Sequence, residues 1–595
     1  MRAPNFILIP SLIAGELWRR ASRRIRKGPL YRWRYSGAGV DQLTIAPTEL
    51  RPADITLATQ FYMGQFTFAN ETISTAGEPP FTIPAPSDEW FAELHSFKWL
   101  RHLRAANSDL MQAHASALVS DWISQWGSQI ESQSWRPDII NGRLISWLTH
   151  SPLLINNTSP ESYQEFLKSL ARQTRYLNHI SPSVRDGYPR LHTRIALAFA
   201  ALCLDGKEKA IKQATHDLNS ELNRQILADG GHVSRNPVIL VELLADLIPL
   251  RQAYQELGHS PSHTLLSAID RMLAVLRFFQ HSNGELAQFN GTGSTPAKML
   301  STILSFDESK GSPQRSAPQS GYERLAENNT VVLIDTGKAL SRGTARRAMA
   351  GTLSFELSSG STRFIANCGV PSSAYKIYAP YARATAAHST ATIGNKSSSR
   401  FATDSKFHSL LPSPLIRGPN QISLSRDQTQ EYETLTASHD GYLQEFGIIH
   451  TRNLHLSNNG EVLNGSDEFT RQPAPQSTLP PSVPIELRFH LPPAISASML
   501  TSGHSILIAT QDNDAWTFTC VDGPISLEES IQFSGPDLPR KSQQIVVSIN
   551  AQTKTEVRWT LERRIKKPAK RPRATSNTPN STPDLLDGLE NNGAT

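Results

Sequence analysis

The periodicity of the apolar residues changes once along this chain, near residue 310, and this change constrains the fold more than any other feature. From about Ser87 to Gln280, apolar residues recur three and four positions apart, which is the spacing of one face of an α-helix. After Tyr322 the pattern becomes short alternating runs such as Thr330–Asp335 and Pro484–Leu491, bounded mostly by Gly, Asn, Asp or Pro. The sequence therefore predicts a helical half followed by a β-rich half.

Proline and glycine divide the helical half into segments of roughly 12 to 25 residues, as in an array of antiparallel α/α pairs. The breaks include Arg136-Pro137, Ser151-Pro152 and Ser159-Pro160. In the second half, further runs at 351–357, 504–509, 516–521 and 544–547 also read as strands, and an antiparallel β-sandwich is their natural closure. The expected fold class is α+β multidomain, with an N-terminal incomplete (α/α) toroid followed by a C-terminal antiparallel β-sandwich.

The same patterns predict the domain boundaries. Composition after about Arg564 becomes rich in Lys, Arg and Pro and then in Ser, Thr and Asn, with too little apolar surface to bury, so we expect this tail to be disordered. The expected regions are a basic segment and extension (1–85), the toroid (86–306), a linker (307–322), the sandwich (323–563) and the tail (564–595).

The formal charge of +6 is small for this length, but the basic residues gather at the two ends of the chain. No aromatic residues interleave with the basic run from Arg563 to Arg573, so we do not expect nucleic acid as a partner. Phe6–Lys27 fits either a simple first helix or a basic amphipathic segment in peripheral contact with a membrane. Its basic cluster follows the apolar run, the reverse of the order in a signal peptide.

Cysteines and sequence motifs exclude several other classes of site. The three cysteines, Cys203, Cys368 and Cys520, are far apart and have no CxxC or CxxH spacing, so they predict neither a zinc site nor a disulfide framework. The chain has no P-loop, dinucleotide fingerprint, HExxH or GxSxG motif. We therefore expect no cofactor.

Five segments carry a resemblance to a known family. They occur in order along the chain as Asp229–Val238, Ile269–Gly284 with Phe289-Asn-Gly291, Gly351–Glu356, Asn367-Cys-Gly369 and Arg383–Thr390. Together they resemble the heparinase II/III-like polysaccharide lyases, over about Trp90 to Ser530. The resemblance implies β-elimination of an acidic, uronate-containing polysaccharide, in which a base removes a proton, donors stabilise the enolate-like charge and an acid protonates the leaving oxygen.

The resemblance places the first candidate site at the start of a helix. His232 and Asn236 are the expected catalytic contacts to the uronate carboxylate, and Arg235 is an expected substrate-binding residue, because the N-terminal end of a helix favours an anion. The alternative is structural: Asn236 or Ser234 caps the helix, Pro237 takes its first position, and His232 is a turn residue.

The resemblance adds a second group of candidates. His388 is the third expected catalytic residue, while Asn290, Tyr381 and Arg383 are expected to bind substrate. The proton-transfer group would be His232 or one of the tyrosines at 375 to 381. Each has a structural alternative: a lone imidazole commonly makes a structural hydrogen bond, tyrosines pack, and arginines are usually solvated or paired.

Departures from the family pattern make enzymatic activity uncertain. Where the lyases have a tyrosine-histidine pair this chain reads Val238–Val241, where they have a histidine-x-histidine pair it has Arg347 and Met349, and Asn367 replaces the metal-site aspartate. We therefore expect no metal site. Two hypotheses follow: a polysaccharide lyase of the cell envelope or periplasm, or a non-catalytic glycan-binding or envelope-assembly protein. The poor signal segment leaves a cytoplasmic location as the alternative.

Overall fold

The structure is a computed structural model. It describes residues 5–28, 33–35, 40–156, 158–204, 207–309, 311–340, 347–402, 415–472, 482–512, 514–533 and 538–564. The tail predicted at 564–595 therefore lies, from residue 565 on, outside the described residues.

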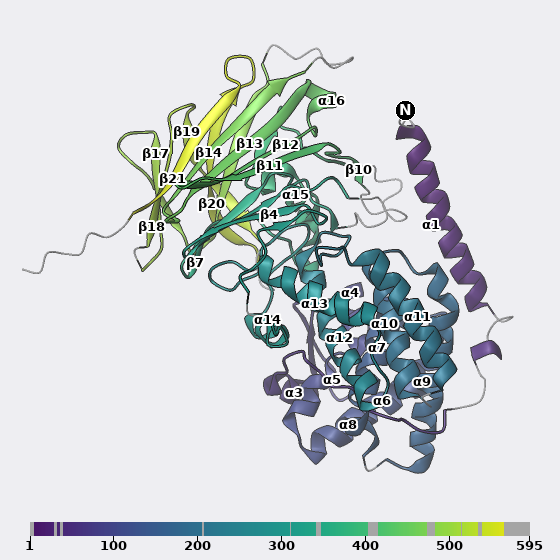
Figure 1. The fold of residues 1–595 in the computed structure, drawn as a ribbon. Coiled ribbons are helices and arrows are strands. Elements are labelled where there is room, and N and C mark those ends of the chain that lie inside the picture. The colour runs from purple at the N-terminus through teal and green to yellow at the C-terminus, as the bar shows by residue number, and fades with distance from the viewer. Residues whose placement is uncertain are drawn as a thin grey trace, which may run out of the picture.

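The first half of the chain is helical (Figure 1). A hairpin of β1 (Gln65–Phe68) and β2 (Glu71–Ser74) is its one described sheet. The helices are α1 (Asn5–Lys27), α3 (Ile55–Tyr62), α4 (Asp88–Ser96), α5 (Leu100–Ala106), α6 (Asp109–Trp126), α7 (Pro137–Thr149), α8 (Ser151–Ile155), α9 (Pro160–Ile180), α10 (Tyr188–Cys203), α11 (Glu208–Gln225), α12 (Pro237–Glu256), α13 (His263–Phe278) and α14 (Ala297–Leu304).

Proline and serine set where these helices begin. The predicted breaks at Pro137, Pro152 and Pro160 each fall at the first or second position of a helix, where the missing N–H has no intrahelical partner to lose. Serines cap others: the side chains of Ser87 and Ser262 accept hydrogen bonds from backbone N–H groups in the first turns of α4 and α13.

The second half forms antiparallel sheets (Figure 1). The five-stranded sheet has the order β3-β4-β5-β6-β7, the four-stranded sheet β19-β20-β15-β8 and the eight-stranded sheet β11-β12-β13-β14-β21-β18-β17-β16. The strands are β3 (Ser316–Ala317), β4 (Tyr322–Glu327), β5 (Thr330–Asp335), β6 (Phe355–Ser359), β7 (Thr362–Ile365), β8 (Ala391–Ile393), β11 (Ile422–Gln428), β12 (Tyr432–His439), β13 (Ile448–Ser457), β14 (Val462–Arg471), β15 (Pro484–Leu491), β16 (Ser496–Met499), β17 (Ser505–Ala509), β18 (Ala515–Cys520), β19 (Ile525–Gln532), β20 (Arg540–Asn550) and β21 (Glu556–Arg564).

Strand β5 joins the two halves. Every residue of β5 is buried, and alternate side chains belong to different cores. Val331 and Leu333 pack with the helical core, whereas Val332 and Ile334 pack with the core of the sheets. Since successive side chains of a strand point to opposite faces, the five-stranded sheet lies between the helices and the other sheets.

The predicted fold class is confirmed: a helical domain is followed by antiparallel β-sheets. The strand expected at 351–357 begins only at Phe355, because Gly351–Ser354 forms a turn in which Leu353 has φ 62°. All three cysteines are buried and unpaired. Among the described residues, none of the helices combines the length and the apolar character needed to cross a bilayer.

Candidate functional site

The turn between α11 and α12 holds the first candidate, His232. Its backbone pairs with Ile226 in an antiparallel bridge, and Gly230, at φ 90°, lies so close to α13 that a Cβ would sit 2.0 Å from the Arg271 carbonyl oxygen. The His232 side chain is 2% exposed. Its Nδ1 lies 2.7 Å from Ser234 Oγ and its Nε2 3.0 Å from Gln225 Oε1. Both ring nitrogens are therefore engaged, one by the turn itself and one by the last residue of α11.

Burial keeps this imidazole neutral. Loss of solvent lowers the pKa of His232 from 6.5 to about 4, and the more distant Asp186 carboxylate offsets little of that effect. A neutral imidazole with pKa about 4 is a weak base near pH 7, and a sugar would have to displace Gln225 or Ser234 to reach it.

The lowered pKa of His232 predicts a dependence of stability on pH. Because the folded-state pKa lies below the unfolded value, this contribution is complete above pH 6.5 and is lost as the pH falls from 6.5 toward about 4. His232→Gln should make the free energy of unfolding less dependent on pH in that window, by up to about 1.4 kcal/mol per pH unit. Urea unfolding of both proteins from about pH 8 to about pH 5 measures this, and equal slopes would contradict the neutral, buried state.

Asn236 begins helix α12. Its Oδ1 accepts hydrogen bonds from the Val238 N–H at 3.1 Å and from the Thr292 hydroxyl at 2.7 Å, so the residue caps the helix and ties it to the loop that follows Phe289. The Nδ2 of Asn236 is buried, with no hydrogen-bond partner within the described part of the chain. A Cβ on Gly291 would lie 3.2 Å from this Nδ2 and 3.0 Å from the Cβ of Arg347. The amide thus faces a loop beside Arg347.

Substitutions at Asn236 separate capping from ligand binding. Asn236→Ala should lower the free energy of unfolding by about 0.5–2 kcal/mol, because Val238 N–H and the Thr292 hydroxyl lose their acceptor. Asn236→Asp should preserve the cap, since a carboxylate accepts the same bonds. Urea unfolding measures both effects. Equal losses in the two variants would show that Nδ2, rather than the capping oxygen, stabilises the fold.

Arg235, which has φ 56°, reaches from the helical domain to the sheets. Its Nε donates to the Ser320 carbonyl at 2.6 Å, its Nη2 donates to the Gly321 carbonyl at 2.9 Å, and Nη2 also pairs with the Asp335 carboxylate. The guanidinium carbon lies 4.7 Å from the ring centre of Tyr322. All of its polar and stacking contacts are therefore internal to the protein.

Asn290 joins the same network, which we call the interdomain clamp: Arg235, Asn290, Tyr322 and Asp335. The Nδ2 of Asn290 donates to the Tyr322 hydroxyl at 2.7 Å and to Asp335 Oδ2 at 3.0 Å, and the Tyr322 hydroxyl donates to the Arg235 carbonyl at 2.6 Å. Asn290, Tyr322 and Asp335 are buried, and only 9% of the Arg235 side chain is exposed. Of the predicted site residues, the structure thus brings Arg235 and Asn290 together, around two residues that the sequence did not single out.

His388 and Arg383 contact segment 347–351, the same segment that bonds to Asn290 of the interdomain clamp. His388 Nδ1 donates to the Ala384 carbonyl at 2.8 Å, and burial lowers the pKa of the ring. Gly351 packs against it, since a Cβ there would lie 2.7 Å from His388 Cδ2. Arg383 Nε donates to the Ala348 carbonyl at 2.9 Å, and its guanidinium stacks on Phe401.

Tyr381 stands apart from this group. It lies on the four-residue helix α15 (Ala379–Ala382) with 70% of its surface exposed. Among the described residues, no hydrogen bond joins the side chains of His232, Asn236 and His388 to one another. The backbone of segment 347–351 connects the two groups: Met349 N–H donates to Asn290 Oδ1 at 3.4 Å, and Ala350 N–H donates to the Arg383 carbonyl at 2.9 Å.

The donor set at the family's metal position does not fit a divalent metal. Asn367 is buried and uses both ends of its amide: Nδ2 donates to Glu356 at 3.2 Å, and Oδ1 accepts from the Ser389 N–H at 3.0 Å. Of the expected imidazole ligands, His388 alone remains, since Arg347 and Met349 occupy the positions of the other two. A transition-metal site needs three or four N, O or S ligands, and no group of three His, Cys, Asp or Glu gathers suitably among the described residues.

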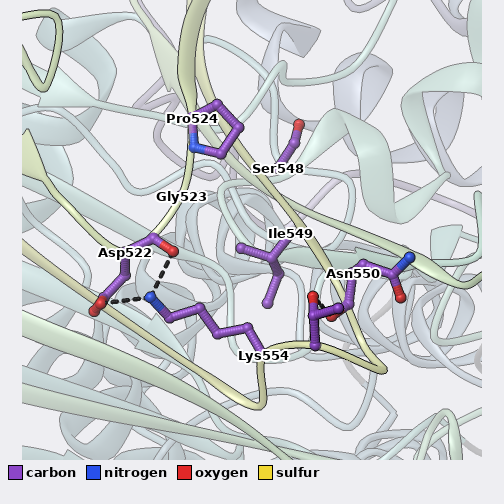
Figure 2. A pocket seen from close by; sticks show the side chains of 8 residues that line it. Asp522, Gly523, Pro524, Ser548, Ile549, Asn550 and Lys554 are labelled. Carbon is purple, nitrogen blue, oxygen red and sulfur yellow. Dashed lines mark hydrogen bonds and ion pairs between the residues drawn. The ribbon is translucent and has the colours of Figure 1, made fainter.

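A surface pocket of about 340 Å³ lies on the β-domain, and none of the predicted site residues lines it (Figure 2). It opens beside the turn after β18, where Lys554 Nζ donates to the Asp522 carboxylate and carbonyl, both at 2.6 Å. Its lining residues are Asp522, Gly523, Pro524, Ser548, Ile549, Asn550, Thr553 and Lys554. Its one amino group is already paired with a carboxylate, so the pocket offers no uncompensated charge for an acidic ligand.

Comparisons with known proteins agree with this architecture. Residues 309–560 match the family model described as Heparinase II/III-like, C-terminal. FtsZ-localized protein C from Caulobacter vibrioides is 28% identical over 568 residues, which cover 92% of this chain and 96% of that protein.

Solved structures share the fold at low sequence identity. A crystal structure of heparinase III superposes with a TM-score of 0.68 at 15% identity, covering 89% of this chain and 88% of that one. Heparan sulfate lyase HepC from Pedobacter heparinus superposes with a TM-score of 0.58 at 15% identity, covering 87% and 86%. At these identities the likeness concerns the fold alone.

Proposed function

Residues 309–560 match the heparinase II/III-like C-terminal family model, and on that premise we propose that the protein is a non-catalytic member of this family that acts in cell-envelope assembly at the site of division. One observation carries the proposal. Both ring nitrogens of His232 are held in internal hydrogen bonds, Asn236 Oδ1 caps a helix, and His388 Nδ1 is bonded to a backbone carbonyl.

Proton abstraction from a uronate needs a base whose lone pair reaches the sugar, with a second group to protonate the leaving oxygen. His232 bonds to Gln225 and Ser234 through both ring nitrogens, and His388 bonds to a backbone carbonyl through Nδ1. Arg347 and Met349 stand where the family has its paired histidines. A guanidinium stays protonated near pH 7 and a thioether carries no proton, so neither replaces an imidazole in acid-base work.

The relative of nearly equal length supports the second part of the proposal. Its name places that protein with FtsZ, and the match extends over almost the whole of both chains. The similarity spans the helical domain as well as the β-domain, so the proposal concerns the whole architecture. We propose that this chain likewise localises with FtsZ and uses the heparinase fold as a scaffold.

Two measurements test the proposal. A fluorescent fusion of the full chain should form a band that coincides with FtsZ, and depletion of FtsZ should disperse it. The purified protein should release no unsaturated product, followed by ultraviolet absorbance, from a panel of uronate polysaccharides. A lyase rate that His232→Ala or His388→Ala abolishes would overturn the non-catalytic assignment. A fusion that does not co-localise with FtsZ, or that keeps its position when FtsZ is depleted, would overturn the localisation.

A second function, binding of an acidic glycan without cleavage, is favoured by one specific observation. The buried Asn236 Nδ2 has no hydrogen-bond partner within the described structure, and it lies beside the loop against which the exposed Arg347 packs. An amide donor next to a guanidinium suits a carboxylate. Calorimetric titration with uronate oligosaccharides should give an affinity that Arg347→Ala weakens at least tenfold, with Arg400→Ala, an exposed arginine of the same domain, as the control.

A further inference from the structure

Between residues 13 and 27, where its side chains are described, helix α1 packs on the protein through charged groups. Glu16 is 4% exposed and pairs with Arg185 at 2.6 Å and with Arg19 at 2.8 Å. Farther along, Arg26 donates to the His179 carbonyl at 2.7 Å, and Lys27 to the Glu131 carbonyl at 3.4 Å. The face of α1 that lies against the helical domain is therefore a polar one.

The opposite face of α1 is apolar and exposed to solvent. Leu17 is 50% exposed, Trp18 72% and Ile25 60%, and Ala14 and Ala21 are exposed as well. At about 100° per residue these five positions fall within roughly one third of the circumference of the helix, so they form one continuous stripe. We call it the apolar stripe: Ala14, Leu17, Trp18, Ala21 and Ile25.

This arrangement is the reverse of an ordinary surface helix, which buries its apolar face and exposes its charged one. Figure 1 shows α1 on the flank of the helical domain, with its N-terminal end directed away from it. The Glu16–Arg185 pair attaches the charged face to the turn before α10, which fixes the apolar stripe on the outside. A large exposed aromatic ring in such a stripe marks a surface that is covered in use.

The charge around the apolar stripe is strongly positive. Between Ile13 and Lys27 the helix carries six basic residues and a single acid, Glu16, which the Arg185 pair already neutralises. Arg20 and Arg24 follow the edge of the stripe, and both are exposed. Arginines beside an apolar stripe can lay their aliphatic stems along a bilayer while their guanidinium groups contact phosphate.

We propose that the apolar stripe of α1 docks on a membrane surface rich in anionic lipid headgroups. Trp18, Leu17 and Ile25 enter the boundary between headgroups and acyl chains, and Arg20 and Arg24 contact the lipid phosphates. The helix lies parallel to the surface and holds the helical domain beside the bilayer. Charge complementarity favours lipid over a second copy of this chain, because two such helices would bring their arginines together.

Co-sedimentation of the full chain with vesicles tests the proposal. The protein should bind vesicles containing phosphatidylglycerol and should bind pure phosphatidylcholine vesicles at least tenfold more weakly, with a loss of binding as salt increases. Trp18→Glu and Leu17→Glu should each reduce binding at least tenfold, since each replaces a buried apolar group with a charge. Arg24→Glu should reduce it roughly tenfold.

Matched variants control for fold and for charge. Val521→Glu adds the same charge at a site that is 72% exposed on the β-domain, and Arg400→Glu reverses an exposed arginine there; both should bind vesicles like the wild type. Circular dichroism should show equal helix content in all variants, because every substituted side chain is exposed.

Two outcomes would overturn the proposal. Undiminished vesicle binding by Trp18→Glu would show that the stripe is not the docking surface. Sedimentation velocity that shows self-association of the wild type, lost in Trp18→Glu, with no vesicle binding by either, would assign the stripe to a second copy of the chain. Neither outcome depends on the division-site role, because the lyase assay and the FtsZ localisation are measured separately.

Discussion

Replacing Arg235 with alanine should lower the free energy of unfolding by about 3–5 kcal/mol, because it leaves a buried carboxylate without its cation. Asp335 is 3% exposed. It would keep the hydrogen bonds from Asn290 Nδ2 and from the Gly337 N–H, both at 3.0 Å, but it would lose its one paired guanidinium. The carbonyls of Ser320 and Gly321 would also lose a donor each.

Urea unfolding followed by circular dichroism measures this loss. Arg235→Lys should recover only part of the stability, because an ammonium group does not reproduce the fork that meets Ser320, Gly321 and Asp335 together. The double variant Arg235→Met with Asp335→Asn should recover most of it, since no unpaired charge remains. Wild-type stability in Arg235→Ala, together with lost glycan affinity, would instead support the substrate-binding role expected from the sequence.

Asp467→Ala should destabilise the β-domain by a similar amount, about 3–5 kcal/mol, because it leaves the buried Arg452 guanidinium without its carboxylate partner. Arg452 and Asp467 are both fully buried, 2.8 Å apart from Nε to Oδ1. Asp467 also accepts from His450 Nε2 at 2.7 Å and Trp559 Nε1 at 2.9 Å. Burial alone would raise the pKa of Asp467, but the Arg452 charge and the His450 bond lower it to about 2.

Losing Asp467 would also weaken contacts outside the sheet of Arg452. Arg452 Nη1 donates to the carbonyls of Leu353 at 2.7 Å and Ser389 at 2.8 Å, and Asp467 holds this guanidinium in place. The measurement is again the midpoint of urea unfolding. Glu468→Ala is the matched control: its carboxylate is partly exposed on the adjacent position of β14 and should cost less than about 1 kcal/mol. Equal effects of the two substitutions would show that the Asp467 network contributes little.

Local sequence patterns determined the elements of this protein. Spacing and proline position predicted helices that begin at Pro137 and Pro160, and alternation predicted β5 and β15 with their observed bounds. These features could be predicted because a helix or a strand depends on residues a few positions apart. The same locality explains the error at Gly351–Ser354, where a turn interrupts an apolar run that resembles a strand.

The contacts of the candidate site residues were decided by the tertiary structure. Asn236 is a helix cap, as one of the two readings of the sequence proposed, and that could be predicted because the cap bonds a residue two positions away. The engagement of Arg235 and Asn290 with Asp335 and Tyr322 was not predictable, because these partners lie 32 to 100 positions away in the sequence.

The sequence by itself thus determined the two halves, their order and the positions at which the family's chemistry has changed. Only the tertiary structure decided that His232 and Asn290 are held in internal hydrogen bonds, and that α1 displays its apolar stripe outward. The physical reason is the same in both cases. Periodicity reveals that a face is apolar or polar, but which surface that face meets depends on chain segments brought together by folding.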